Sequence, residues 1–493
     1  MTSVRKVVSN TALLSAAQIL NPLTSIVLVS AIARAHGAEV LGKYSLVLAI
    51  FYMATGLGGL NLQTPITRSV AVRKERASDF LVAASALGLV SSLLAIGGAH
   101  VFVELLDYSP DVSHAVSVLI WAVIPSMLIM YCEALFIAFH KAQYIAGISI
   151  GENVAKVVVG LILISTGKGI LELFVAFLSL RICACATFLV LFSAKIGPIK
   201  GRLDREIVSE LRKVGPVFTG NLLIETLFGK VDVLLLSKLA TMADVGYYSV
   251  ALRLILIAKL VPQSFTSAVL PVMCEVLLES KEKCNRLFTR SANYMAAYGF
   301  AAALIVVILS EALIIIVYGE HAPEAELVLS LLALAIVPGS LTPVLAAMLF
   351  AANREKLDLW ANLLRVALLV VLCVVLIPLR SSLGAAMAFI ISQVLFLGSL
   401  ALLVRHAVLS ARIAPSLLCP VFAASLGYGI SYFVPEMAPL IRGLLQSVLA
   451  LLIYMMILVA LLPALRNDLI IFSRESLTML QQMLEVAFNF RSR

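Results

Sequence analysis

Two stretches, "GAEVLGKYSLVLAI" (37–50) and "MADVGYYSVALRL" (242–254), carry the same pattern in distant parts of the chain. In each, a small residue, an acid and valine precede G-x-Y-S, which opens an apolar run. Gly42 matches Gly246 at an offset of 204 residues, and the acidic segment before it matches at 205. This offset equals six membrane-crossing runs. Because six is an even number, the chain returns to the same side of the membrane, and both copies have the same orientation. The pattern therefore predicts a parallel internal repeat.

Apolar runs of about 20 residues recur along the whole chain, and each is long enough to cross a bilayer as a helix. Of the 493 residues, 61% are hydrophobic and 13% are charged, and no polar stretch is long enough to fold as a separate soluble domain. The sequence predicts an all-α polytopic membrane protein with about 14 transmembrane helices. They are expected near 11–33, 44–66, 79–103, 113–138, 147–166, 169–193, 214–240, 245–270, 292–317, 326–351, 357–379, 383–404, 413–434 and 440–463.

The repeat groups these helices into two pseudo-symmetric six-helix lobes, followed by two extra C-terminal helices. The expected parts are an N-terminal lobe (1–193), a basic cytoplasmic linker (194–213), a C-terminal lobe (214–404) and two additional helices (405–463). The tail, 464–493, has apolar residues near helical spacing and is predicted to lie on the cytoplasmic membrane surface as an amphipathic helix. Two facing bundles without a catalytic domain are typical of a transporter that works by alternating access.

Lysine and arginine are distributed unequally between the two sets of loops. The loops on the N-terminal side, with the tail, carry about 25 of them, and the opposite loops carry about five. Basic loops stay in the cytoplasm, so both termini are predicted to be cytoplasmic in a multi-pass protein of the cell membrane. The net charge of +9 is explained by this orientation, and nucleic-acid binding is not expected. The seven cysteines form no CxxC pair, and neither a metal site nor a Walker A motif is recognisable.

Ionisable residues within the predicted spans are costly in lipid and indicate function. Arg181 lies near the middle of one span, Arg253 lies in the span 245–270, and Arg365 is alone in another. Each can instead form a buried ion pair with another helix. Glu152 and Lys156 have i,i+4 spacing with the acid first, which predicts a structural ion pair. Cations exceed acids in the spans, and this surplus implies a water-filled cavity, an anionic ligand or both.

The span 214–240 carries four further candidates. Glu225, Gly229 and Asp232 are expected on one face of a continuous helix, where glycine leaves room for a neighbour or a ligand, whereas Lys230 points elsewhere. The two acids are candidates for H⁺ or Na⁺ coupling. The alternative is structural pairing with Lys230 or Arg253.

A cationic cavity favours an anionic substrate. A pyrophosphate headgroup cannot cross hydrocarbon unaided, whereas arginine and lysine can bind its oxygens in place of water. A cavity that opens sideways to lipid would let an attached acyl or prenyl chain stay in the bilayer.

The stretch "GKVDVLLLSKLATMADVGYYSVALRLILIAKLVPQSFTSAVLPVM" (229–273) resembles the seventh-to-eighth-span signature of Wzx-type oligosaccharide flippases. These belong to the polysaccharide transporter branch of the multidrug/oligosaccharidyl-lipid/polysaccharide exporter superfamily. The matching positions are Asp232, Val245-Gly246 with Tyr248, Ala251 with Arg253-Leu254, Pro262 and Leu270-Pro271. "NTALLSAAQILNPLTSIVLVSAIARAHGAEVLGKYSLVLAI" (10–50) also resembles the family, with Arg34 in its "A-R-x-x-G" position.

The resemblance implies two lobes in a V shape around a cationic central cavity, with Arg34, Asp232 and Arg253 among its functional residues. It implies transport of a polyprenyl-pyrophosphate-linked oligosaccharide from the inner to the outer leaflet for O-antigen, exopolysaccharide or capsule synthesis. Glycosyltransferases or a polymerase of the same pathway would be partners. Many members have twelve spans, and lipid II flippases also have two added helices, so lipid II remains an alternative substrate. A cation-coupled multidrug exporter is another alternative. An enzyme is not expected, because no outer loop is long enough to carry a catalytic site.

Overall fold

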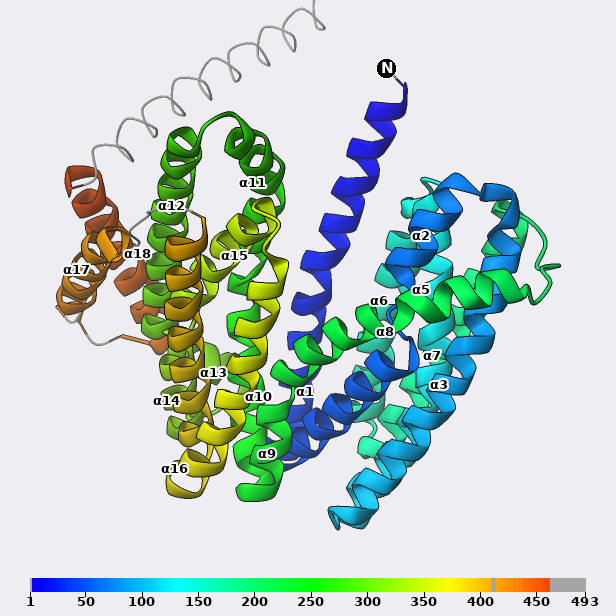
Figure 1. Ribbon diagram of the computed structural model, residues 1–493. Coiled ribbons are helices and arrows are strands. Elements are labelled where there is room, and N and C mark those ends of the chain that lie inside the picture. The colour runs from blue at the N-terminus through cyan, green and yellow to red at the C-terminus, as the bar shows by residue number, and fades with distance from the viewer. Residues whose placement is uncertain (1, 409–413, 432, 436, 462–493) are drawn as a thin grey trace, which may run out of the picture. The chain divides into compact units, whose positions relative to one another are not determined.

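The computed structural model describes residues 2–408, 414–431, 433–435 and 437–461. Side chains are described throughout these ranges except at 2–21, 23, most positions of 214–227, 414–416 and 431. All regular structure in the described residues is helical (Figure 1). The predicted all-α class is confirmed. The predicted amphipathic tail, 464–493, lies outside the described residues.

Within the part of the chain that the structure describes, ten helical segments are long and apolar enough to cross a membrane. Two of the long helices, α1 and α16, each contain a break and hold two predicted spans, and the remaining predicted spans fall on α8–α9 and α17. The helices are α1 (Thr2–Gly58), α2 (Gln63–Val72), η1 (Lys74–Arg76), α3 (Ala77–Leu105), α4 (Pro110–Leu119), η2 (Ile120–Ala122), α5 (Val123–Ala138), α6 (Ala142–Ser165), α7 (Ile170–Lys195), α8 (Arg205–Phe228), α9 (Val231–Leu239), α10 (Met242–Ala258), α11 (Leu260–Glu279), α12 (Lys281–Ile308), α13 (Ser310–Tyr318), α14 (Pro323–Ala333), α15 (Ile336–Ala351), α16 (Glu355–Ala407), α17 (Ala414–Ser431) and α18 (Pro439–Leu461).

The break in α1 is at Gly37, with φ 80° and ψ 179°, a backbone conformation that glycine adopts without steric cost. The break in α16 is at Ser381, with φ 48°. A third break was not predicted: α8 ends at Phe228, and α9 begins at Val231. The expected continuous helix over 214–240, with one face shared by its two acids, is therefore wrong. An acid in the first turn of α9 explains the restart, because Asp232 accepts a hydrogen bond from the Val233 N–H at 2.7 Å.

The chain forms two compact units. Unit 1 consists of Met1–Ile257, Ile314–Leu329 and Asn362–Ser392, and unit 2 consists of Ala258–Leu313, Ser330–Ala361 and Gln393–Arg493. These bounds differ from the predicted lobes, because segments of the expected second lobe cluster with the first. The lobe boundaries stay a prediction.

The core of unit 1 is aromatic and closely packed. Phe80, Phe136, Phe188 and Phe192 are buried with Tyr131, whose hydroxyl donates to the Gly59 carbonyl at 3.0 Å. The start of α8 joins this core through Ile207 and Leu211, so half of the predicted linker is a packed helix. In lipid, where there is little hydrophobic drive between helices, such packing and interhelical hydrogen bonds hold the bundle together.

The two copies of the sequence repeat pack against each other within unit 1. A Cβ on Gly42 would overlap the Met242 carbonyl oxygen, and a Cβ on Gly246 would overlap the Ala38 carbonyl oxygen. The approach is therefore reciprocal, because each glycine lies against the backbone of the other segment. The glycines that define the repeat in sequence are the residues that let α1 and α10 come this close.

Unit 2 is built around α12. Phe288 and Met295 pack with Leu345 and Met348 of α15, and Leu304 packs with the additional helices α17 and α18. Tyr454 of α18 donates a hydrogen bond to a carbonyl of α12 at 2.8 Å. The two additional helices therefore belong to the packed bundle of unit 2.

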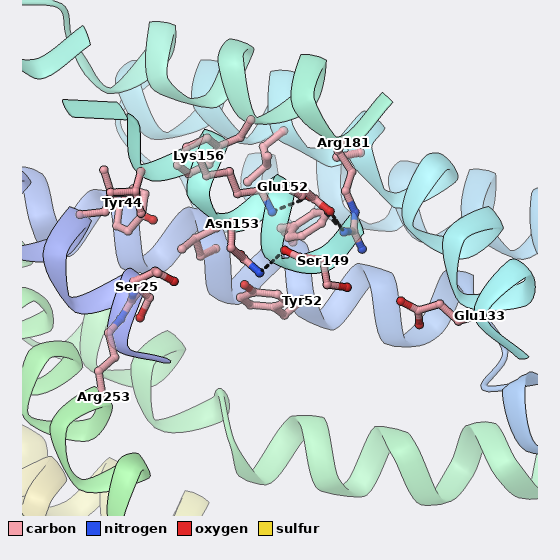
Figure 2. Close-up of a pocket in the computed structure, with 18 residues that line it drawn as sticks. Ser25, Tyr44, Tyr52, Glu133, Ser149, Glu152, Asn153, Lys156, Arg181 and Arg253 are labelled. Atoms are coloured by element: carbon pink, nitrogen blue, oxygen red, sulfur yellow. Dashed lines mark hydrogen bonds and ion pairs between the residues drawn. The ribbon is translucent and has the colours of Figure 1, made fainter. Parts of the chain in front are cut away.

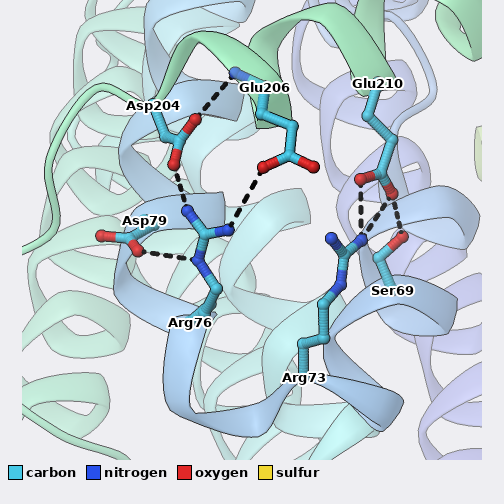
Figure 3. Close-up of polar contacts among 7 residues, drawn as sticks. All are labelled: Ser69, Arg73, Arg76, Asp79, Asp204, Glu206 and Glu210. Atoms are coloured by element: carbon cyan, nitrogen blue, oxygen red, sulfur yellow. Dashed lines mark hydrogen bonds and ion pairs between the residues drawn. The ribbon is translucent and has the colours of Figure 1, made fainter.

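A polar cluster ties the start of α8 to the loop between α2 and α3 (Figure 3). Nη2 of Arg73 contacts both carboxylate oxygens of Glu210, at 2.8 and 2.7 Å, and Ser69 donates to the same carboxylate at 2.6 Å. Arg76 bonds Asp79 at 3.2 Å and also bonds Asp204. The cluster fixes the beginning of α8 on the basic end of unit 1, the end that carries segments 68–76 and 195–205.

This cluster should make stability depend on pH. The backbone N–H of Glu206, and then Arg76, lower the pKa of Asp204. Burial alone would raise the pKa of Glu210, but Ser69 and Arg73 outweigh it and lower that pKa. A lowered folded pKa means that the stabilisation is present above the unfolded values, about 3.9 for Asp and 4.3 for Glu, and is lost as pH falls through the folded values.

We expect Glu210→Gln to lower the melting temperature at pH 7, by the equivalent of roughly 1 kcal/mol or less for these half-exposed pairs. The difference from wild type should shrink as pH falls below the unfolded value of about 4.3 and vanish once Glu210 is protonated in both states. Thermal melts in detergent across this pH range measure it, with Glu279→Gln, in an exposed i,i+4 pair, as the control. A difference that persists unchanged at pH 3 would contradict the assignment.

Candidate functional site

A cavity of about 370 Å³ lies within unit 1 (Figure 2). Its walls come from both parts of α1, from α4–α5, α6 and α7, and from α10. Lys156, Arg181 and Arg253 are the cations in its lining, and Glu133 and Glu152 are the carboxylates. Such a mixture of polar and aromatic side chains in membrane-crossing helices is typical of a substrate site.

One carboxylate in the cavity forms ion pairs with two cations. Glu152 contacts the Lys156 ammonium at 2.6 Å and Nη1 of Arg181 at 2.9 Å. The Glu152 side chain is 6% exposed, whereas each cation is 26% exposed. The buried acid therefore holds two partly open cations at the cavity wall (Figure 2), and the group keeps one net positive charge.

The backbone before α5 helps to position Arg181. Ser126 donates to the Ala122 carbonyl of η2 at 2.6 Å and accepts a hydrogen bond from Nε of Arg181 at 2.9 Å. Nε and Nη1 are thus used by the protein, while Nη2 makes no hydrogen bond to any described residue. A guanidinium held this way presents its remaining N–H groups to a ligand.

Arg253, the third cation of the lining, and Lys230, which lies beside the cavity, each contact an aromatic ring. Tyr44 and Tyr52, about two turns apart on α1, both line the cavity. The Arg253 guanidinium carbon lies 5.6 Å from the Tyr44 ring centroid, and the Lys230 ammonium lies 5.3 Å from that of Tyr52. Neither cation has a carboxylate within 4.0 Å among the described side chains, so their charges are available to an anion.

Two polar features complete the wall. Asn153 donates to the Ser149 carbonyl at 2.8 Å. Glu133 of α5 lines the cavity without a hydrogen bond to any described residue, and Figure 2 shows it apart from the pair of cations on Glu152. The cavity therefore combines a cationic wall with an acidic group.

Asp232 is buried behind this site, and its partner is a hydroxyl. It is 1% exposed and accepts a hydrogen bond from Tyr248 at 2.6 Å. Neither Lys230 nor Arg253 forms an ion pair with it within 4.0 Å, so direct pairing of Asp232 with those cations, the alternative to ion coupling, is not seen. The Asp232 side chain instead contacts α10 through Tyr248. The side chain of Glu225 lies outside the described residues.

Arg34 and Arg365 do not line this cavity. Arg34 donates to the Ile316 carbonyl at the end of α13, beside Ser30, which donates to the Val317 carbonyl at 3.0 Å. It therefore caps a helix C-terminus, where a positive charge is favourable. The Arg365 guanidinium stacks on Phe228 at 3.5 Å and donates to Asn362 at 2.7 Å.

Among the residues singled out from the sequence, the structure thus brings Arg181 and Arg253 into one cavity, with Lys230 beside it. Sequence reasoning treated Glu152 and Lys156 as a local ion pair and missed their place in the site. It also missed Tyr44 and Tyr52. The spacing of the two tyrosines on one face of a span was the available signal.

Sequence comparison now decides the family. A family model described as polysaccharide biosynthesis protein matches residues 7–277, which is more than half of the chain. The chain belongs to this family. The resemblance to Wzx-type flippases is thereby confirmed. A search of curated protein sequences gives no match.

Solved structures of transporters share the fold of this family member at low sequence identity. The lipid II flippase MurJ, in an inward closed conformation, matches with a TM-score of 0.75 and 14% identity over 92% of this chain and 99% of its own. An inward-facing multidrug resistance MATE family transporter of the MOP superfamily gives 0.62 and 14%, over 83% and 95%. A MOP superfamily transporter from Pyrococcus furiosus, described by the reverse polarity of its binding pocket, gives 0.53 and 13%, over 86% and 95%. The fold of this chain is therefore that of these solved transporters and flippases.

Proposed function

We propose that the protein is a flippase for a polyprenyl-pyrophosphate-linked oligosaccharide, which it moves from the inner to the outer leaflet for O-antigen, exopolysaccharide or capsule synthesis. The observation that supports this most directly is the set of cations at the unit 1 cavity. Lys156 and Arg181 share one carboxylate. Arg253 and Lys230 lie over tyrosine rings. Diphosphate supplies the negative charge that this site lacks.

The arrangement suits a diphosphate chemically. Hydrogen bonds between guanidinium groups and phosphate oxygens contribute roughly 1.5–3 kcal/mol each, and this replaces part of the hydration that the headgroup loses in the membrane. Cation–π contacts hold Arg253 and Lys230 in place without neutralising them. Hydroxyl and amide groups at Ser25, Ser149 and Asn153 can bind sugar hydroxyls.

Transport would proceed by alternating access in the inner membrane, with both termini in the cytoplasm and with glycosyltransferases or a polymerase of the same pathway as partners. Coupling to H⁺ or Na⁺ is proposed at Asp232, with Glu225 as the second candidate. Asp232 is buried, and its hydrogen-bond partner is an uncharged hydroxyl. This supports the proposal, because a buried carboxylate that has no direct ion pair favours uptake of a proton or metal ion.

The test is the flipping rate of a fluorescent polyprenyl-diphosphate oligosaccharide in vesicles that contain the purified protein. We expect Arg253→Ala and Lys230→Ala each to lower the rate at least ten-fold, by loss of a charged hydrogen bond of about 1.5–3 kcal/mol. Arg253→Lys should retain more activity if Arg253 acts as a single charge than if it binds two oxygens at once.

Arg286→Ala is the matched control, because this arginine forms an exposed i,i+4 pair on α12. Wild-type rates in both alanine variants at equal protein levels would rule out the cationic site. The same vesicles distinguish the alternatives: efflux of a cationic dye without lipid flipping would favour a multidrug exporter, and preference for lipid II would favour that substrate.

A further inference from the structure

A second hollow, here called the α1–α3 groove, lies on the membrane-crossing part of unit 1. It has a volume of about 440 Å³ and is lined by residues that include Ala54, Leu57, Ala95, Gly98 and Leu234. Both α1 and α3 are apolar enough to cross a membrane, and Leu94, at the groove edge, is 73% exposed. The groove therefore opens where hydrocarbon surrounds the protein.

The chemistry of the groove fits a hydrocarbon chain. Ser91 is the one polar residue in its lining, and its hydroxyl donates to the Leu57 carbonyl at 2.8 Å. A Cβ on Gly98 would meet nothing within 4 Å, so space remains beside the α3 backbone. A polar occupant would find no partner here and would bear the cost of an unsatisfied hydrogen bond.

The groove adjoins the cationic cavity at Lys230. Lys230 precedes Leu234 of the groove by one turn, and its carbonyl accepts the Leu234 N–H at 3.2 Å. Its ammonium lies over Tyr52, which lines the cavity, and the next residue of α1, Met53, lines the groove. A cation without a described carboxylate partner thus stands where a polar cavity and an apolar groove meet.

We propose that the α1–α3 groove binds the polyprenyl chain of the carried lipid, with the phosphate nearest that chain at Lys230. This inference rests on the proposed function. In a polyprenyl diphosphate the hydrocarbon chain is joined directly to phosphate. The chain would lie in the groove, its phosphate at the ammonium of Lys230, and the rest of the headgroup in the cavity. A phospholipid of the surrounding bilayer instead places a glycerol ester between its hydrocarbon and its phosphate, whereas Lys230 lies only one turn from Leu234 of the groove.

The experiment uses the full-length protein in detergent and two neighbouring glycines of α3. Gly97 and Gly98 are both exposed, with nothing within 4 Å of an added Cβ, but only Gly98 lines the groove. Gly98→Leu fills the groove, and Gly97→Leu is the matched control. The probes are a fluorescent polyprenyl diphosphate, inorganic pyrophosphate and phosphatidylglycerol.

We expect Gly98→Leu to weaken polyprenyl diphosphate binding at least ten-fold and to change pyrophosphate binding less than two-fold, whereas Gly97→Leu changes neither. If Gly98→Leu does not run as a folded peak in gel filtration, Gly98→Ala decides, with a two- to three-fold loss expected. Unchanged polyprenyl diphosphate affinity in the folded Gly98 variant overturns the groove assignment, and so does equal displacement of the probe by phosphatidylglycerol. Failure of the wild type to bind either diphosphate would instead overturn the proposed function.

Discussion

Replacing Gly246 with alanine should lower the free energy of unfolding by about 3 kcal/mol, the upper end of the usual cost of overpacking. The added Cβ would overlap the Ala38 carbonyl oxygen, which is backbone and cannot rotate away. The close approach of α1 and α10 would have to open, and the contacts along this crossing would be lost. Gly42→Ala should behave alike, because its Cβ would overlap the Met242 carbonyl oxygen.

Thermal denaturation in a fixed detergent, followed by loss of the folded peak in gel filtration, measures this effect. Gly151→Ala is the matched control, because Gly151 lies in a helix with nothing within 4 Å of an added Cβ. It should be neutral or stabilising by up to about 1 kcal/mol, since alanine has the higher helix propensity.

The double variant Gly42→Ala/Gly246→Ala should cost less than the sum of the single variants. Once one methyl group has separated the helices, the second finds space, so the two effects are coupled. If Gly246→Ala were as stable as Gly151→Ala, or if the two effects were additive, the reciprocal packing of the repeat would be contradicted.

Glu152→Ala should have the second largest effect. The substitution leaves Lys156 and Arg181 side by side without their shared carboxylate. Because each cation is 26% exposed, the loss of stability should be smaller than the roughly 3–5 kcal/mol that a fully buried, uncompensated charge costs. Arg181→Ala should be milder for stability, because Glu152 keeps its contact with Lys156. It should nevertheless slow lipid flipping at least ten-fold, because Arg181 provides the open N–H groups.

A second substitution separates these two roles. Adding Arg181→Met to Glu152→Ala removes one uncompensated cation, so the double variant should be more stable than Glu152→Ala alone, while flipping should stay impaired. Melting temperature and flipping rate on the same preparations give both results. A double variant no more stable than Glu152→Ala would show that the carboxylate does not serve both cations. Wild-type flipping by Arg181→Ala would remove Arg181 from the site.

The sequence predicted well those features that depend on neighbours along the chain. Apolar runs of membrane length predicted the helices, and the matching segments around Gly42 and Gly246 predicted the repeat, whose two copies do meet in unit 1. The i,i+4 pair of Glu152 and Lys156 also forms, since its geometry is set within one helix.

Prediction was weaker where partners lie on different helices. Arg181 had no acid close in sequence, yet it bonds Glu152, 29 residues earlier. The sequence left Asp232 between ion coupling and pairing with a cation, and it did not predict the hydrogen bond that Asp232 accepts from Tyr248 on the next helix. Arg34 fits a family position by sequence, and in the fold it caps the end of α13.

By itself, then, the sequence determined that this chain is a bundle of membrane helices and that its spans carry more positive than negative charge, and it predicted a repeat whose two matching segments lie in contact. Only the tertiary structure decided which cations are neutralised, which lie on Tyr44 and Tyr52, and which of them share one cavity. Hydropathy and spacing are properties of a single helix and survive any packing arrangement. The partner of a buried charge depends on how each helix is rotated against its neighbours, and packed side chains from the whole bundle set that rotation together.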